Sequence, residues 1–505
     1  MPIPIPEVAA AGLLVDAADD VATAVQPLAR GTVVSAGGRI VVLGEDIAAG
    51  HKVALRTIAQ GDTVRKFGAP IGVATAAIGT GCGVHTHNLA TRLSGDEAPT
   101  GGRVAYAFDR AVVDPPAATF LGYRRPDGRV GTRNEVWILC TVGCVARTAQ
   151  KSAARAAELY DDRVDGIHAY THPHGCSQLG DDLADTRRVL AAMAAHPNAG
   201  GVLLVGLGCE SNALDTLLAD VPAERRERLR WFSAQGVEDE VAAGIAAVAE
   251  LVASMSEDVR VPCALGDLTI GLKCGGSDGL SGLTANPLVG RVADRCVAAG
   301  GTAILTEIPE AFGAEQVLYA RAATPAVQAE LAALFAEFRR YYLDRGLPVH
   351  ENPSPGNIAG GITTLEEKSL GAVQKGGRSP VTDVVRYGGR ARISGLTLLE
   401  APGNDAVSST ALVAAGATVI LFTTGRGTPL GFPAPTLKIA SNSPLARRKP
   451  GWIDFDAGTL LDGEAPDVAA ARLFELLVET ASGRRTCSER NGEREIALWK
   501  RGVTL

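Results

Sequence analysis

The chain has 505 residues. This is longer than a chain that folds around one hydrophobic core, so the length predicts two or three domains. Hydrophobic residues make up 46% and charged residues 21% of the sequence, which is a globular composition and excludes a disordered chain. The formal net charge is −7 and no basic stripe is present, which argues against a nucleic-acid partner. No apolar run reaches the roughly 20 residues of a membrane-spanning helix, so we expect no membrane partner.

The start of the chain predicts the compartment of the protein, and the compartment decides how its cysteines are interpreted. The first twenty residues lack the basic beginning of a secretion signal and contain several acidic residues, so we expect a cytoplasmic protein. There, the nine cysteines are expected to be buried, catalytic or metal-bound rather than paired in disulfides.

Residues 1–95 predict a small β-rich domain, because short apolar alternations are broken by Gly, Asp and Pro. A polar, proline-bearing segment over 96–120 predicts a linker.

After residue 120 the pattern of apolar residues changes. Alanine-rich helical stretches at 146–160 and 181–196 alternate with apolar runs that predict buried parallel strands. This alternation predicts an α/β fold with a doubly wound parallel sheet, whose sites gather at the carboxyl ends of the strands. The four apolar runs are 134–145, 201–210, 301–310 and 417–427.

A weak internal repeat is visible in this region. The stretch "GGSDGLSG" leads to one strand and "PGNDAVSS" leads to another, with Asp278 and Asp405 in equivalent places. We interpret the α/β region as two related half-domains, 121–260 and 261–505, that face one site.

Two His-x-His pairs stand out in a chain with eight histidines. His85 and His87 lie in "GVHTHN", and His172 and His174 lie in "THPHGC". In extended backbone, residues two apart point to the same side, so each pair could serve a metal or acid/base chemistry. The alternative is that each histidine is an ordinary surface or core group.

Four cysteines lie in glycine-flanked loops: Cys144, Cys176, Cys209 and Cys274. They could assemble a soft-metal or redox-sensitive iron site, with hard oxygen ligands from Glu210, Asp278 or Glu307. The absence of a Cys-x-x-Cys pair argues against a structural zinc ribbon. The alternative is that each cysteine is a small hydrophobic side chain that fills a tight turn.

Polar residues are concentrated in the stretch 351–377, where Asn352, Ser354 and Asn357 offer donors and acceptors, and Lys368 and Lys375 could pair with an anion. Arg129 and Arg133, in "RPDGRVGTRN", are suited to bidentate binding of a carboxylate. Together these segments predict recognition of an anionic or polyhydroxylated ligand. The alternative is a solvated surface loop.

Eight motifs taken together resemble the altronate/galactarate dehydratase family, in the family's order and over nearly the whole chain. They are "GVHTHNLA", "GYRRPDGRVGTRN", "THPHGCSQ", "GLGCESN", "LKCGGSDGLSGLTANPLVG", "EIPEAFGAE", "NPSPGNIAGGITTLEEKSLGAVQKGG" and "GNDAVSST". The resemblance implies that residues 1–95 form a SAF-type β-clip domain. It also implies an enzyme that dehydrates sugar acids to 2-keto-3-deoxy acids and depends on iron(II). Sulfolactate sulfo-lyase is a relative in the same family.

The resemblance and the chemistry of dehydration lead to a hypothesis about the site. A divalent metal, Fe(2+) or alternatively Mn(2+), would polarise a hydroxyl while a base removes the C2 proton. We expect His172 or His174, or the first pair, to act as acid or base. We expect metal ligands among His85, His87, Cys176, Cys209, Glu210 and Cys274. The expected substrate-binding residues are Arg133, Asn352, Ser354, Lys375, Asp278 and Asp405.

The sequence is also compatible with three other functions. They are a sulfo-lyase that releases sulfite, a non-catalytic sugar-acid binding protein and a zinc hydrolase. An iron–sulfur cluster on three of the four loop cysteines is an alternative to mononuclear iron. A homodimer is the default expectation for the assembly.

Overall fold

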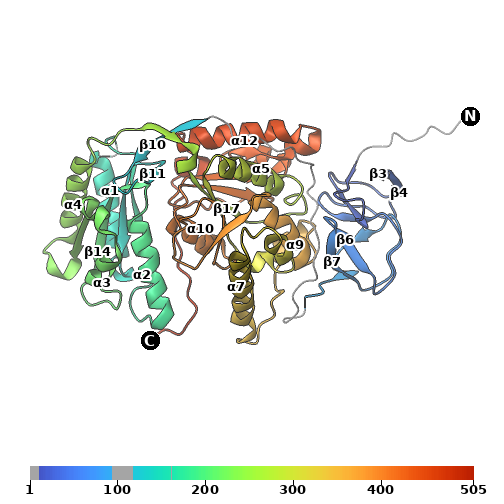
Figure 1. Ribbon diagram of the computed structural model, residues 1–505, viewed down its shortest axis with the longest axis horizontal. Coiled ribbons are helices and arrows are strands. Elements are labelled where there is room, and N and C mark those ends of the chain that lie inside the picture. The colour runs from blue at the N-terminus through green and yellow to red at the C-terminus, as the bar shows by residue number, and fades with distance from the viewer. Residues whose placement is uncertain (1–10, 94–117, 161) are drawn as a thin grey trace, which may run out of the picture.

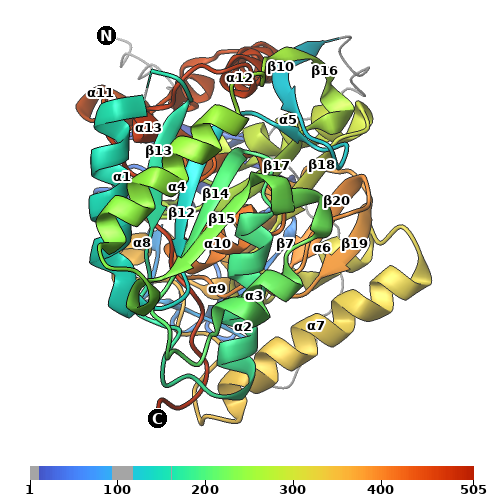
Figure 2. The ribbon, with the colours of Figure 1, turned by 90° about the vertical axis from the view of Figure 1, so that its left-hand side faces the viewer.

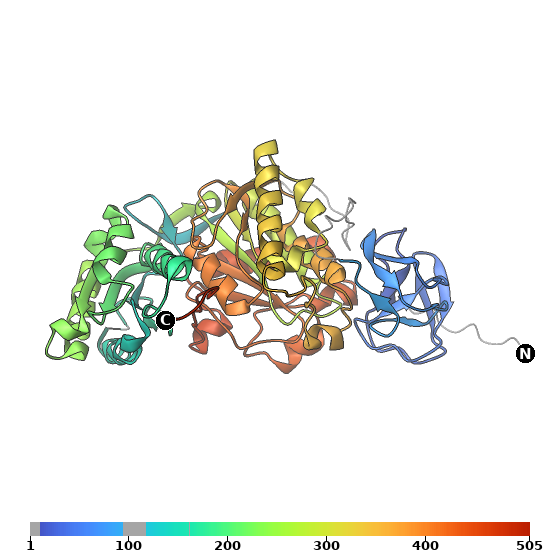
Figure 3. The ribbon, with the colours of Figure 1, turned by 90° about the horizontal axis from the view of Figure 1, so that it is seen from below.

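The computed structural model of the chain describes residues 11–93, 118–160 and 162–505. Three bodies lie in a row along its long axis (Figures 1 and 3): a strand-rich N-terminal body, a central body built on a seven-stranded sheet, and an outer body built on a four-stranded sheet. The predicted order of a small β domain followed by an α/β region is therefore confirmed. The domain boundaries expected at 95, 120 and 260 remain predictions.

The N-terminal body consists of small antiparallel sheets with the orders β1-β2-β5-β8, β3-β4 and β6-β7-β9. Glycine and aspartate turns keep its strands short, and alternate residues of β3 and β6 point into the core. The strands are β1 (Gly12–Leu13), β2 (Val21–Ala24), β3 (Val33–Ala36), β4 (Arg39–Val42), β5 (Lys52–Ala54), β6 (Thr63–Lys66), β7 (Ala69–Ala74), β8 (Gly83–Val84) and β9 (Leu89–Ala90).

The predicted linker lies outside the described residues up to position 117. The chain resumes in a small antiparallel sheet of order β11-β10-β16, whose strands are β10 (Thr119–Arg124), β11 (Val130–Gly131) and β16 (Val261–Ala264). This sheet pairs strands from both expected half-domains, and it lies against α12 (Pro466–Ala481).

The outer body contains a parallel sheet of order β13-β12-β14-β15. Its central strands are buried at every position, as the continuous apolar runs predict. Helices α1 and α4 cover one face, as Figure 2 shows, and α2 and α3 cover the other. The elements are β12 (Glu135–Cys140), β13 (Gly166–Tyr170), β14 (Ala199–Gly206), β15 (Leu229–Ser233), α1 (Ala146–Tyr160), α2 (Gly180–Ala194), α3 (Leu214–Asp220) and α4 (Glu240–Ser254).

The central body is a parallel sheet of order β19-β20-β18-β17-β21-β22-β23. Helices α5 and α12 pack together over one face, and α10 contacts β17 and also contacts α2 of the outer body. Helices therefore cover both sheets, and the predicted doubly wound α/β class is confirmed. The strands are β17 (Thr269–Cys274), β18 (Thr302–Leu305), β19 (Val381–Val385), β20 (Gly395–Leu399), β21 (Val419–Thr424), β22 (Thr436–Ala440) and β23 (Phe455–Asp456).

The helices that follow β16 along the chain belong to the central body. Among the described residues, no helix combines the length and apolarity that crossing a bilayer requires. These helices are α5 (Ala285–Ala298), α6 (Glu315–Tyr319), α7 (Pro325–Leu343), α8 (Pro355–Ala359), α9 (Leu365–Ala372), α10 (Asp405–Ala414), α11 (Ser443–Arg448) and α13 (Cys487–Arg490).

Both copies of the internal repeat lie in the seven-stranded sheet. The first connects β17 through α5 to β18, and the second connects β20 through α10 to β21. The repeat therefore relates two crossovers of one sheet, and it does not relate the outer body to the central one.

The N-terminal body docks onto the central body beside α9 (Figure 1). Three glycines allow the close approach: a Cβ on Gly279 would lie 2.0 Å from the carbonyl oxygen of Gly50, and one on Gly361 would lie 2.3 Å from the same oxygen. Two buried ammonium groups join the bodies, since Lys52 and Lys66 both bind the Glu367 carboxylate, at 2.7 and 2.9 Å. The SAF-like domain is therefore an integral part of the molecule.

Candidate active site

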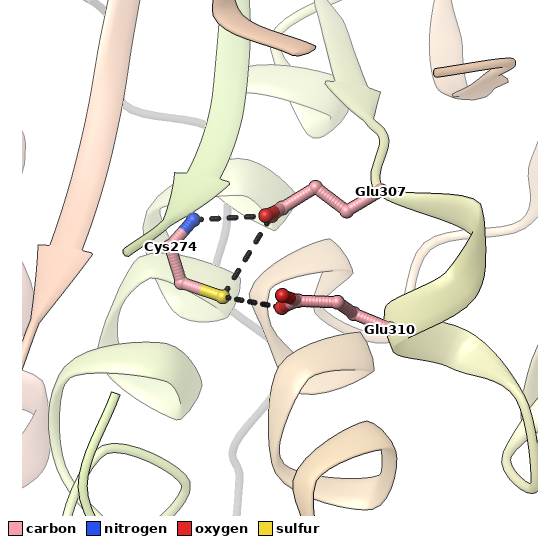
Figure 4. A group of neighbouring side chains, drawn as sticks. All are labelled: Cys274, Glu307 and Glu310. Carbon is pink, nitrogen blue, oxygen red and sulfur yellow. Dashed lines mark hydrogen bonds between the residues drawn. The ribbon is translucent and has the colours of Figure 1, made fainter. Parts of the chain in front are cut away.

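The ends of two neighbouring strands bring three acidic groups together. Cys274 is the last residue of β17, Glu307 follows β18, and Glu310 lies in the 3-10 turn Ile308–Ala311. One ligand atom from each lies within 4.8 Å of the others, and Figure 4 shows the side chains converging. Glu307 has a left-handed backbone with φ 71°, which is costly for this residue type and aims its carboxylate at the amide of Cys274, 3.2 Å away.

Three lysine ammonium groups neutralise this cluster. Lys273 contacts Glu307 and lies 2.8 Å from Asp405, and Lys375 lies 3.1 Å from Glu307 and 2.7 Å from the Cys274 sulfur. Lys368 donates to Glu310 at 2.8 Å. The network therefore pairs three ammonium groups with the carboxylates of Glu307, Glu310 and Asp405.

The electrostatics of the cluster favour the charged forms of Lys273 and Glu310. Burial would lower the pKa of Lys273, but Asp405 and Glu307 raise it above its usual range. Burial likewise opposes the charge of Glu310, but Lys368, Lys273 and Lys375 lower its pKa to about 2. Burial, with help from Glu307, raises the pKa of Cys274 to about 12, so Cys274 is a thiol at neutral pH.

A pocket of about 480 Å³ opens beside this network, within the range of small-molecule sites. Lys368 forms part of its wall, where Asn352 and Asn357 hold the ammonium group at 2.9 and 3.1 Å. Asn357 also completes a capping box with Ser354 at the start of α8, which fixes this loop. The polar and charged lining residues are Glu310, Tyr342, Glu351, Asn352, Ser354, Asn357, Lys368, Asn404 and Asp405.

The Cys274, Glu307 and Glu310 set fits a metal ion by distance but does not fit it by charge. A thiolate and two carboxylates suit a divalent transition metal. Here lysine ammonium groups already contact the Cys274 sulfur and both carboxylates, where a metal ion would bind. Adding a divalent ion to a buried network that is already neutral would leave uncompensated positive charge, so we derive no step through a metal at this place.

His85 is half-buried between the N-terminal body and the turn before α9, whereas His87 is exposed. The Nδ1 atom of His85 lies 2.9 Å from the Thr363 hydroxyl, on the turn that leads into α9. Burial and the Lys52 charge lower the pKa of His85 to about 4, so it is neutral at pH 7. Neither ring belongs to the Cys274 group, so the expected convergence of both rings on one metal stays a prediction.

The other predicted residues of the central body divide into two groups. Lys375, Asp405, Asn352 and Ser354 lie in or beside the pocket, together with Cys274. Asp278 instead holds neighbouring backbone in place, because its carboxylate accepts from Ser281, Ser441 and Asn442 at 2.8, 2.8 and 3.0 Å.

Arg133 was expected to bind substrate, and the structure corrects this. Its guanidinium group makes two bonds to Glu489, at 2.7 and 3.0 Å. Its other donors bind the carbonyl oxygens of Thr132, Thr480 and Arg484, so no donor is left for a ligand carboxylate. Arg129 is likewise paired, with Asp127.

His172, His174, Cys144, Cys176, Cys209 and Glu210 all belong to the outer body, at the carboxyl end of its sheet. His172 is buried against the Cys140 carbonyl oxygen at 2.9 Å, and its burial lowers its pKa to about 4. Glu210 accepts from Thr141 at 2.5 Å and from the amide of Gly208 at 2.6 Å, which occupies its carboxylate. The single metal site expected from Cys176, Cys209, Glu210 and Cys274 is therefore divided between two sheets.

Lys273 and Glu310 were not predicted as site residues, whereas Lys368 was predicted to pair with an anion. A lysine inside the apolar strand "TIGLKC" was an available signal, because a fully buried ammonium group needs carboxylate partners. Two glutamates directly after the strand at 302–305 were the matching signal.

Polar and charged side chains that line an open pocket, at the carboxyl ends of parallel strands, are typical of an α/β enzyme that binds a polar small molecule. The family models for the altronate/galactarate dehydratase SAF domain, the D-galactarate dehydratase/altronate hydrolase second domain and the D-galactarate/altronate dehydratase C-terminal domain match residues 10–92, 122–256 and 265–504. The chain belongs to the D-galactarate/altronate dehydratase family.

Three curated relatives extend over nearly all or most of the chain. Altronate dehydratase of Escherichia coli (strain K12) is 47% identical over 97% of this chain and 99% of its own length. Altronate dehydratase of Bacillus subtilis (strain 168) is 45% identical over 96% of this chain and 98% of its own length. Galactarate dehydratase (L-threo-forming) of Escherichia coli (strain K12) is 33% identical over 87% of each chain. The predicted class, a sugar-acid dehydratase of the hydro-lyase type, is therefore confirmed.

Proposed function

We propose that this dehydratase acts on an aldonate of the altronate type at the pocket beside Lys368. The observation that carries the proposal is the fixed ammonium group of Lys368 in the pocket wall, held by Glu310, Asn352 and Asn357. The ammonium group donates its three protons to Glu310, Asn352 and Asn357, so a substrate carboxylate would replace the asparagine oxygens as its partner. The asparagines and Ser354 suit the hydroxyl groups of the substrate. The higher identity to the altronate dehydratases, 47% and 45% against 33% for galactarate dehydratase, favours an aldonate over an aldarate.

Dehydration of a 2,3-dihydroxy acid requires removal of the C2 proton and departure of the C3 hydroxyl group. Lys368 would bind the carboxylate and stabilise the negative charge that develops when the C2 proton leaves. Asp405 lines the pocket, and 35% of its side chain is exposed, so we assign it to accept that proton. Glu310 stays ionised and positions Lys368. The C3 hydroxyl group takes this proton back from Asp405 and leaves as water. The resulting enol becomes the 2-keto-3-deoxy acid.

Fe(2+), with Mn(2+) as the alternative, remains a proposed cofactor that rests on the family resemblance. Such an ion supplies Lewis-acid polarisation of a carboxylate and a hydroxyl group when bound. The homodimer and the cytoplasmic location also remain proposals, and light scattering of the purified protein tests the first of them.

The second candidate, a sulfo-lyase, has less support because the full-length relatives compared above are dehydratases. Product analysis separates the two reactions. Anaerobically purified protein, with and without added Fe(2+), is assayed against altronate, galactarate and sulfolactate for 2-keto acid and for sulfite. We expect 2-keto-3-deoxy acid from altronate, less from galactarate, and no sulfite. Sulfite release from sulfolactate as the fastest reaction would overturn the proposal, as would binding of sugar acids without turnover under every condition.

A further inference from the structure

The exposed cysteines of this chain are gathered at one place. Of its nine cysteines, five are buried and Cys82 is half-buried, whereas Cys144, Cys176 and Cys209 are exposed. Cysteine is among the most buried residue types, so three exposed cysteines on one surface indicate a role other than packing.

The three cysteines follow three adjacent parallel strands. Cys144 lies just beyond β12, Cys176 follows β13 and Cys209 follows β14, and β12 is the middle strand of the three. Neighbouring strands lie about 4.8 Å apart, so the three loops begin within about 10 Å of one another. All three cysteines therefore lie at the carboxyl end of the sheet, where sites form in parallel sheets.

Hydrogen bonds lock the three loops together next to the cysteines. The amide of Gly143 donates to the His174 carbonyl oxygen at 2.8 Å, which joins the first loop to the second. The amide of Asn212 donates to the Gly175 carbonyl oxygen at 2.9 Å, which joins the third loop to the second. The side chain of Asn212 donates to the Thr141 carbonyl oxygen at 3.0 Å, which closes the triangle.

Glycines and the end of the chain define this surface further. A Cβ on Gly175 would lie 2.1 Å from the Thr141 carbonyl oxygen, so only glycine permits this contact beside Cys176. The amide of Leu505 donates to the Ser177 carbonyl oxygen at 3.0 Å, so the C-terminal residues secure the same loop. The buried Oδ1 atom of Asn212 has no hydrogen-bond partner, which leaves an unsatisfied acceptor within the loop cluster.

From this arrangement we infer that Cys144, Cys176 and Cys209 are the thiolate ligands of an iron–sulfur cluster at the carboxyl end of the four-stranded sheet. Their sulfur atoms do not belong to any described set of ligands that lies within 4.8 Å. A tetrahedral zinc ion with Zn–S bonds of about 2.3 Å would need sulfurs roughly 3.8 Å apart. In a four-iron cluster each thiolate binds a different iron, so the cysteine sulfurs lie farther apart than in a zinc site. Cys209 now accepts from Gln235 at 3.6 Å, and rotation of this exposed side chain would release it.

The site is separate from the substrate pocket, and the inference does not rest on the proposed substrate. Three protein thiolates leave one iron of a four-iron cluster without a protein ligand. Each thiol loses its proton when it binds iron.

Anaerobically purified full-length protein tests the inference through its iron, acid-labile sulfide and visible charge-transfer absorbance. The single variants Cys144→Ser, Cys176→Ser and Cys209→Ser should each lose most of the iron and the absorbance. The control variant Cys82→Ser should keep both. Iron and absorbance that persist in all three variants, or that are lost instead in Glu310→Gln, would overturn the inference, and so would iron without sulfide.

A second measurement uses the unmodified chain and does not depend on the folding of variants. Alkylation followed by mass spectrometry should find the three thiols protected in the anaerobic protein and reactive after oxidative removal of the cluster. Equal reactivity before and after this treatment would contradict the inference. Neither measurement uses turnover, so a failure of the proposed substrate assignment leaves this test intact.

Discussion

Glu367 and Lys368 are adjacent residues of α9 whose side chains bind different bodies of the molecule. Glu367 forms ion pairs with Lys52 and Lys66 of the N-terminal body. Lys368 forms an ion pair with Glu310 beside the pocket. Because the two residues share one helix, docking of the N-terminal body fixes the helix that presents Lys368 to the pocket. This relationship gives the SAF-like domain a direct structural role in the site.

Lys368→Met should remove the charge that binds the substrate carboxylate. Loss of a close charged hydrogen bond costs about 3 kcal/mol, so we expect kcat/KM for altronate to fall by about 10² or more. Lys151→Met, on the exposed face of α1, is the matched control and should leave kcat/KM unchanged. Wild-type turnover in a folded Lys368→Met variant would remove Lys368 from the account.

Glu310 and Glu367 should make the stability of the folded protein decrease at acid pH. Lysine partners lower the pKa of both Glu310 and Glu367 to about 2 against the opposing effect of burial, and the unfolded value is about 4.3. Groups with a lowered folded pKa stabilise the protein above the unfolded value, and this stability is lost as the pH falls toward the folded one. We expect each to contribute roughly 3 kcal/mol between about pH 4.3 and pH 2.

Denaturant unfolding as a function of pH checks this expectation. The free energy of unfolding should fall steeply below about pH 4.3, and the fall should be shallower in Glu310→Gln. A flat profile from neutral pH to about pH 3 would contradict the assigned ion pairs.

His85→Ala should have a modest effect and His87→Ala a smaller one. His85 makes one hydrogen bond to Thr363, so its loss should lower kcat/KM about tenfold through a displaced α9. Because His85 is neutral above about pH 5, the shape of the kcat/KM profile between about pH 6 and pH 8 should not change. Kinetics of both variants across this range provide the measurement, and a lost titration step would return His85 to an acid or base role.

Arg133→Met should affect stability and leave substrate binding unchanged. Its guanidinium group neutralises Glu489 in the interior, and removal of one partner of a buried pair costs about 3–5 kcal/mol. Denaturant unfolding should show this loss, whereas Arg155→Met at an exposed ion pair should cost less than about 1 kcal/mol. An increased KM without a loss of stability would restore the original substrate-binding interpretation.

Local patterns predicted the elements well because they depend on neighbouring residues. The run at 134–145 contains β12, and the helix expected at 146–160 coincides with α1. Cys274, Lys375 and Asp405 were each expected in a site, and the structure places them around one ammonium–carboxylate network. Lys273 and Glu310 were missed because their roles arise from partners distant in sequence, which no periodicity reveals. Both histidine pairs were expected at one site, His85 and His87 as metal ligands and His172 or His174 as acid or base, because residue type alone gives no distances.

The most direct test of the account is a crystal structure of the Asp405→Asn variant with altronate bound. The substitution keeps the shape of the pocket and removes the carboxylate assigned to take the C2 proton. We expect the altronate carboxylate to contact Lys368 and the C2 atom of altronate to face residue 405. Altronate bound at the cysteine loops of the outer body, away from Lys368, would contradict it.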